Sequence, residues 1–151
     1  MVAQIEHDFR EKVSRSLRLA SEGVDRYRVF TPFMFDDGDC LGIVLKREGD
    51  RWFLTDEGHT LMHLTYAVDE RDLLRGTRQK IISNALAAFA VQDREGELVL
   101  PIEGDEYGDS LYSFVQALIK ITDVSYLTRE RVRSTFLEDF RALLREAVPS
   151  D

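Results

Sequence analysis

The fold is decided by one stretch of the sequence, CLGIVLKREGDRWFLT, which covers residues 40–55. Its two halves, residues 40–47 and 51–55, are rich in β-branched, aromatic and other apolar side chains, which favour a pleated strand. Between them lie a glutamate, a glycine and an aspartate, a composition typical of a tight turn. The stretch therefore predicts two antiparallel strands joined in a hairpin.

A third strand is predicted before this hairpin. Residues 27–35 (YRVFTPFMF) are aromatic and β-branched, and residues 36–39 (DDGD) have the composition of a turn. Pro32 has no amide proton to donate to a sheet, so we expect this strand to lie at an edge or to bend there. A fourth strand is predicted over residues 97–102. The pattern indicates an antiparallel meander of three strands with one added strand.

Segments with the hydrophobic spacing of helices precede and follow these predicted strands in the sequence. Apolar residues recur every three to four positions over residues 5–20, 56–66, 69–90 and 111–122, which is the spacing of one helix face. Gly76 is expected to divide the longest of these segments in two. We therefore predict an α+β fold, in which an N-terminal helix precedes a three- to four-stranded antiparallel meander covered by helices.

A further amphipathic helix is predicted over residues 128–148. We expect residues 1–122 to form a single α+β domain and residues 123–151 to carry this C-terminal helix. Its apolar stripe must be buried, either against the body of the domain or in association, as when an amphipathic helix enters a groove. The candidate partner-binding residues of the stripe are Val132, Phe136, Phe140, Leu143 and Leu144.

Composition and charge limit the class of protein. The 151 residues fit one compact domain, and 44% hydrophobic with 32% charged residues is an ordinary globular mix. The formal net charge of -8 argues against nucleic acid as a partner, because phosphate contacts need surplus lysine and arginine. We expect neither a membrane span nor a secretory signal. The single cysteine is typical of a reducing compartment, which predicts a cytoplasmic protein.

Acidic residues give the strongest indication of an enzyme. Folding could bring Asp39 together with Asp56 and Glu57 to bind Mg²⁺ or Mn²⁺ for phosphodiester cleavage, and Lys46 could stabilise a phosphoryl oxygen. Nuclease sites of this type need an acidic residue and a lysine two positions apart on one strand, and that pattern is absent here. Turn formation and helix capping explain the same carboxylates. We therefore assign no catalytic residue, metal or cofactor, and a metal-dependent nuclease or nuclease subunit stays as the alternative.

Two histidines and the cysteine are the other candidates for chemistry. His59 and His63 are four positions apart on a predicted helix, so both rings could face one metal ion. A zinc protease would need glutamate directly after the first histidine, and Thr60 occupies that position. We interpret the histidines as surface or half-buried residues, and we expect Cys40 to be a small core residue.

A second acidic group lies in the loop of residues 103–109. Together with the turn at residues 36–39 it could imitate a line of DNA phosphates, as DNA-mimic inhibitors do. A solvated loop explains the same composition, since the chain carries 20 basic residues against 28 acidic ones. An acidic DNA-mimic inhibitor stays as a second alternative.

Three motifs carry a family resemblance: Thr31-Pro32-Phe33, Gly38-Asp39 and Thr55-Asp56-Glu57-Gly58. The chain resembles DUF1828, a bacterial family of unknown function with a Thr-Pro-Phe strand, a Gly-Asp turn and a Thr-Asp-Asp/Glu-Gly element before a helix. The resemblance implies a phage, prophage or defence-island setting. The segment 128–148 is similar to the first part of a second domain that many members carry.

These observations favour a non-enzymatic interaction or regulatory module of a bacterial, phage- or mobile-element-associated protein. The mixed surface charge, the lack of a credible nucleophile and the apolar C-terminal stripe lead to this expectation. The expected partner is another protein or a second copy of the chain.

Overall fold

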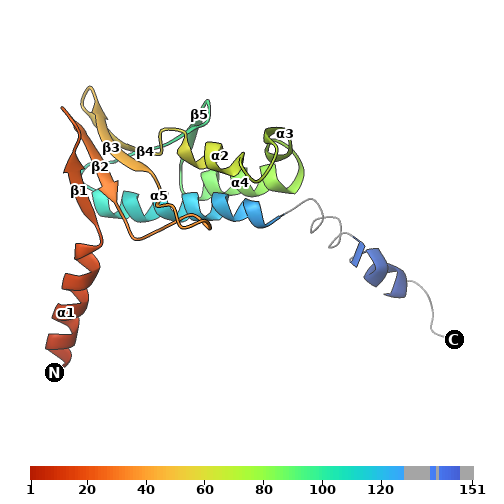
Figure 1. The fold of residues 1–151 in the computed structure, drawn as a ribbon, viewed down its shortest axis with the longest axis horizontal. Coiled ribbons are helices and arrows are strands. Elements are labelled where there is room, and N and C mark those ends of the chain that lie inside the picture. Colours follow the sequence, from red (N-terminus) through yellow and green to blue (C-terminus); the bar gives the residue numbers. More distant parts are fainter. Residues whose placement is uncertain (128–136, 139, 147–151) are drawn as a thin grey trace.

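The computed structural model describes residues 1–127, 137–138 and 140–146. In this part of the chain six strands form one antiparallel sheet in the order β1-β2-β3-β4-β6-β5 (Figure 1). The strands are β1 (Arg18–Ser21), β2 (Arg26–Phe30), β3 (Ile43–Glu48), β4 (Arg51–Thr55), β5 (Gln92–Arg94) and β6 (Glu97–Pro101). The helices are α1 (Val2–Arg15), α2 (His59–Leu64), α3 (Glu70–Leu73), α4 (Gly76–Ala88), α5 (Tyr107–Thr122) and the 3-10 helix η1 (Asp123–Tyr126). The fold is α+β, as predicted.

The predicted hairpin and meander are confirmed, but the strand predicted over residues 27–35 ends at Phe30, before Pro32, and lies between β1 and β3 and not at an edge. Strands β3 and β4 pair from Val44 and Thr55 to Glu48 and Arg51, and β2 pairs with the other edge of β3. The added fourth strand is β6, which pairs with β4. The prediction that the long helical segment divides at Gly76 is also confirmed, because α3 ends at Leu73 and this glycine, with a φ of +65°, is the first residue of α4.

The sheet has two strands more than predicted. The N-terminal helix ends at Arg15, and residues 18–21 form β1 against β2, so the prediction of a helix as far as residue 20 was wrong. Strand β5 was also missed. Glu95 and Gly96 both have positive φ, which makes a two-residue hairpin turn between Arg94 and Glu97.

The core lies between the sheet and the helices. Alternate residues of β3, β4 and β6 (Leu45, Leu54, Leu98 and Leu100) are buried in one cluster with Phe114, Leu118 and Ile121 of α5. Helix α5 runs from the strands to α2 and α4 and contacts all three (Figure 1). Cys40 is exposed beside the turn at residues 36–39, so its prediction as a core residue was wrong.

Two helical segments extend beyond this core. Helix α1 projects away from β1, and none of its residues is buried (Figure 1). Residues 137–138 and 140–146 are helical, and Phe140, Leu143 and Leu144 are exposed there. The stripe residues Val132 and Phe136 lie outside the residues that the structure describes. No helix within the described ranges has the length and apolar character needed to span a membrane.

Candidate functional site

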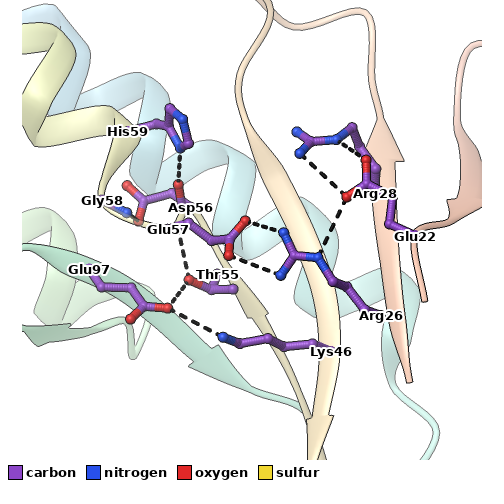
Figure 2. Close-up of polar contacts among 10 residues, drawn as sticks. All are labelled: Glu22, Arg26, Arg28, Lys46, Thr55, Asp56, Glu57, Gly58, His59 and Glu97. Carbon is purple, nitrogen blue, oxygen red and sulfur yellow. Dashed lines mark hydrogen bonds and ion pairs between the residues drawn. The ribbon is translucent and has the colours of Figure 1, made fainter. Parts of the chain in front are cut away.

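Asp56 is the centre of a polar cluster at the end of β4 (Figure 2). Its side chain is buried, with 1% exposure. One carboxylate oxygen accepts hydrogen bonds from the backbone N–H groups of Gly58, at 2.9 Å, and Leu98, at 2.8 Å. The other oxygen accepts from the N–H of Thr60 at 3.1 Å. Asp56 therefore joins the start of α2 to β6, and both of its buried carboxylate oxygens accept hydrogen bonds from backbone amides.

Thr55 and Glu97 extend this cluster across two strands. The Thr55 hydroxyl donates to Glu97 Oε1 at 2.5 Å and accepts from the Glu57 N–H at 2.9 Å. Lys46 Nζ on β3 lies 4.0 Å from the same Glu97 oxygen, and Figure 2 shows both side chains directed toward Thr55. The lysine is therefore paired with a carboxylate rather than presented alone to a substrate.

Glu57 is held by an arginine on β2. Arg26 donates to both of its carboxylate oxygens, at 2.9 and 2.6 Å, and this hydrogen-bonded pair lowers the pKa of Glu57 although partial burial acts in the opposite direction. Glu22 continues the network, because its carboxylate lies 2.6 Å from Arg28 and 3.5 Å from Arg26 (Figure 2). The hydrogen bond from Arg28 lowers the pKa of Glu22. In Figure 2, the three glutamates thus face three cations, while the fourth carboxylate, that of Asp56, is held by backbone amides.

The four candidate nuclease residues are placed in two regions. Glu57 and Lys46 line one cleft of about 900 Å³ between the polar cluster and helices α2, α3 and α4. Asp56 lies beneath this cleft without lining it, and Asp39 is exposed in the separate turn of residues 36–39. Of the candidate set, the geometry brings together in this cleft one ion-paired glutamate and one ion-paired lysine. Three exposed carboxylates that the sequence analysis did not single out, Glu70, Asp93 and Glu95, also line the cleft.

Among the described residues, two other groups have the spacing to hold a cation: His7, Asp8 and Glu11 on α1, all of them exposed, and a group beside α2. Asp36, Asp37 and His63 offer ligand atoms within 4.8 Å of one another, and His63 Nε2 lies 3.8 Å and 3.4 Å from the two carboxylates. The His63 ring stacks on Phe35 at 3.9 Å, whereas His59 directs Nδ1 to the backbone oxygen of Asp56 at 2.9 Å. The two histidines are therefore turned to different partners. The histidine–carboxylate pairs account for the cluster at His63, and sequence spacing alone did not reveal them.

The two acidic groups of the DNA-mimic alternative lie at opposite ends of α5. The loop 103–109 leads into the helix, while Asp36 approaches Ser125 just beyond its last turn. Since the 16 residues of α5 span about 24 Å, the groups do not form one continuous acidic row.

An apolar groove lies on the α5 side of the sheet, and the sequence analysis did not find it. It has a volume of about 530 Å³ and is lined mainly by apolar side chains from β1, β2, β4 and α5. The lining includes Leu17, Leu19, Tyr27, Trp52, Ile102 and Leu111. Strand β1 supplies one wall of the groove. Because residues 18–20 were predicted to continue the N-terminal helix, the groove could not be predicted from the sequence. Helix α1 begins its departure from the body at this wall (Figure 1).

A family model described as "Domain of unknown function DUF1828" matches residues 31–121. The chain belongs to the DUF1828 family. The resemblance of the Thr-Pro-Phe, Gly-Asp and Thr-Asp-Glu-Gly motifs is thereby confirmed, since all three lie inside the matched residues. No curated protein and no solved structure matches the chain. The DUF1828 match contains Asp56 and Glu57 and leaves α1, β1 and β2 outside its bounds, together with the Arg26 that holds Glu57.

Proposed function

We propose that this DUF1828 chain is a non-enzymatic interaction module that binds an amphipathic helix in the apolar groove beside β1. The groove carries the proposal. Two of its large side chains remain open to solvent, with Leu19 56% and Tyr107 42% exposed. An exposed apolar hollow of this kind favours association, because covering it removes hydrocarbon from water.

The charged side chains of the polar cluster support a binding role over catalysis. Asp56 accepts three hydrogen bonds from backbone amides, Glu57 accepts two from Arg26, and Lys46 is paired with Glu97. A general acid, a general base or a metal ligand needs a group that can reach the substrate or the ion. Within the part of the chain that the structure describes, the charged groups of this cluster pair with one another or with backbone amides, and these contacts join β2, β3, β4, β6 and α2.

The setting of the module is part of the proposal. The family resemblance implies a bacterial, phage- or mobile-element-associated protein, and the composition favours the cytoplasm. In such a setting we propose a regulatory role, in which occupation of the groove by a helix reports the presence of a partner protein.

The test uses a probe that does not depend on any sequence of this protein. A fluorescent, stapled helical peptide with apolar residues at helical spacing and neutral polar residues elsewhere is titrated with the chain. The chain carries Phe9→Asp, so that the apolar face of its own α1 does not compete for the groove. Fluorescence anisotropy is expected to show saturable binding.

Two further variants locate the binding surface. Leu19→Asp lies in the groove and should weaken binding about tenfold or more, as expected for removing a buried leucine contact. Val24→Asp is the matched control, because Val24 is exposed and does not line the groove. Absence of binding, or equal losses in both variants, would contradict the proposed function.

A further inference from the structure

We infer that the occupant of the groove is α1 of a second copy of this chain, so that two copies exchange their N-terminal helices in a twofold dimer. This inference rests on the proposed function and names its partner. It is carried by three observations: the apolar face of α1, the short link between α1 and β1, and the position of that link at the wall of the groove.

Helix α1 presents an apolar face whose large side chains are exposed. Ile5, Phe9 and Val13 are spaced by four residues and therefore lie along one side of the helix. Their exposures are 63%, 67% and 43%, respectively. A side chain such as Phe9 is normally among those a protein buries, and three of them in line are typical of a helix that packs on another surface.

The link between α1 and β1 directs this helix away from its own groove. Only Ser16 and Leu17 lie between the end of α1 and the start of β1. Their backbone N–H groups donate to the carbonyls of Val13 and Ser14, so the helical turn continues to the first residue before the strand. Folding α1 back over its own sheet would require a reversal inside these hydrogen-bonded residues. A second copy can occupy the groove without that change.

The same link sets the geometry of an exchange. Leu17 and Leu19 line the groove, so α1 leaves the body at the edge of the surface that needs a cover. A twofold axis close to this edge brings each helix over the groove of the other copy. Each chain offers one helix and one groove. The exchange therefore fills both grooves and covers both helices, and the assembly stops at a dimer.

The length of α1 sets an upper limit on the size of the contact. The 14 residues of α1 extend about 21 Å, and one side of such a helix presents roughly 400 Å². If both helix faces were fully covered by an equal area of the other copy, the dimer would bury at most roughly 1,600 Å². This is the standard size of a specific protein interface, and it is reached only if the rims of the groove are covered together with the groove itself.

The experiment measures the mass of the full chain by sedimentation equilibrium over a range of concentrations. We expect the wild type to have twice the monomer mass of 17.4 kDa. Phe9→Asp damages the helix face and Leu19→Asp damages the groove, and each variant alone should be a monomer. Val24→Asp, outside both surfaces, should remain a dimer.

Mixing the two damaged variants gives the decisive result. In the mixture, the intact helix of the Leu19→Asp chain can enter the intact groove of the Phe9→Asp chain, so a mixed dimer should form where neither variant associates alone. A monomeric wild type, or a dimer that survives both substitutions, would overturn the inference. If the wild type is monomeric while the stapled peptide still binds the groove, the proposed function stands and only the second copy is excluded as the partner.

Discussion

The carboxylate of Asp56 joins three backbone amides that belong to two different elements, and this arrangement has a direct energetic consequence. Replacing Asp56 with alanine leaves the N–H groups of Gly58, Thr60 and Leu98 without their acceptor. We expect Asp56→Ala to lower the free energy of unfolding by about 3 kcal/mol, because unpaired buried donors lose their solvation without compensation. Urea unfolding measures this change.

Asp39→Ala is the control for this prediction. Asp39 is exposed in a turn, and its removal should change the free energy of unfolding by less than about 0.5 kcal/mol. An unchanged urea midpoint in Asp56→Ala would show that the three hydrogen bonds are not what holds α2 against β6.

The pair of Glu57 and Arg26 predicts a dependence of stability on pH. The pKa of Glu57 in the folded chain lies below its ordinary value of 4.5, since Arg26 stabilises the charged form. The stabilisation is therefore fully present above about pH 4.5, and it is lost as the pH falls through the lower folded-state pKa. As the pH is lowered from about 5 to about 3, the melting temperature of the wild type should fall more steeply than that of Glu57→Gln.

A second carboxylate variant tests whether this effect is specific. Glu103 forms an exposed pair with Arg51 at 3.6 Å, and exposed pairs contribute little to stability. Glu103→Gln is expected to follow the wild-type pH profile. The interpretation of the Glu57 pair is wrong if both variants flatten the profile equally.

Sequence reasoning reached these residues but not their partners. The turn signal and the family motif directed attention to Asp56 and Glu57, which are adjacent in the chain. Their partners, Leu98 and Arg26, are 42 and 31 positions away, respectively. Only the register of β2, β3, β4 and β6 brings them together, and a single sequence does not fix which strands are neighbours.

At the scale of elements, the hydrophobic patterns of the sequence predicted helices and strands correctly where the spacing of apolar residues was clear. The hairpin of β3 and β4 has a marked turn between two apolar runs, and the segment of α5 is apolar on most faces. Strand β1 was missed because Leu17 and Ala20 continue the helical spacing of α1, while the pairing with β2 that makes it a strand is a tertiary contact. Strand β5 has three residues, too few for a period to be visible.

Helix α1 is also expected to differ from the other helices in its own stability. An isolated helix of 14 residues is marginal in water, so α1 should be well formed only when its apolar face is covered. Amide hydrogen exchange of residues 2–15 should slow as the protein concentration is raised, while exchange in α5 should not change. Mass spectrometry of the exchanged peptides measures both. Phe9→Asp should abolish the concentration dependence, and slow exchange of α1 in this variant would argue that the helix needs no partner.

At the scale of the whole molecule, the described residues include two helical segments outside the core with exposed apolar side chains, and they suggest different assemblies. The sequence directs attention to the C-terminal stripe, whereas the groove and the short link at β1 direct it to α1. The two assemblies differ in their effect on stability as well as mass. If unfolding is coupled to dissociation of the α1 exchange, the melting temperature of the wild type rises with protein concentration.

Substitutions at the ends of the chain separate these assemblies in one experiment. Leu143 and Leu144 are exposed in the C-terminal helix, so Leu143→Asp with Leu144→Asp removes that apolar surface without touching the groove. We expect this double variant to keep the dimer mass and the concentration-dependent melting temperature of the wild type. Phe9→Asp should lose both properties, and its melting temperature should no longer depend on concentration. If instead the double variant becomes a monomer and Phe9→Asp keeps the dimer, association belongs to the C-terminal stripe. The reason is that the melting temperature depends on concentration only when the contacts of the dimer are broken on unfolding.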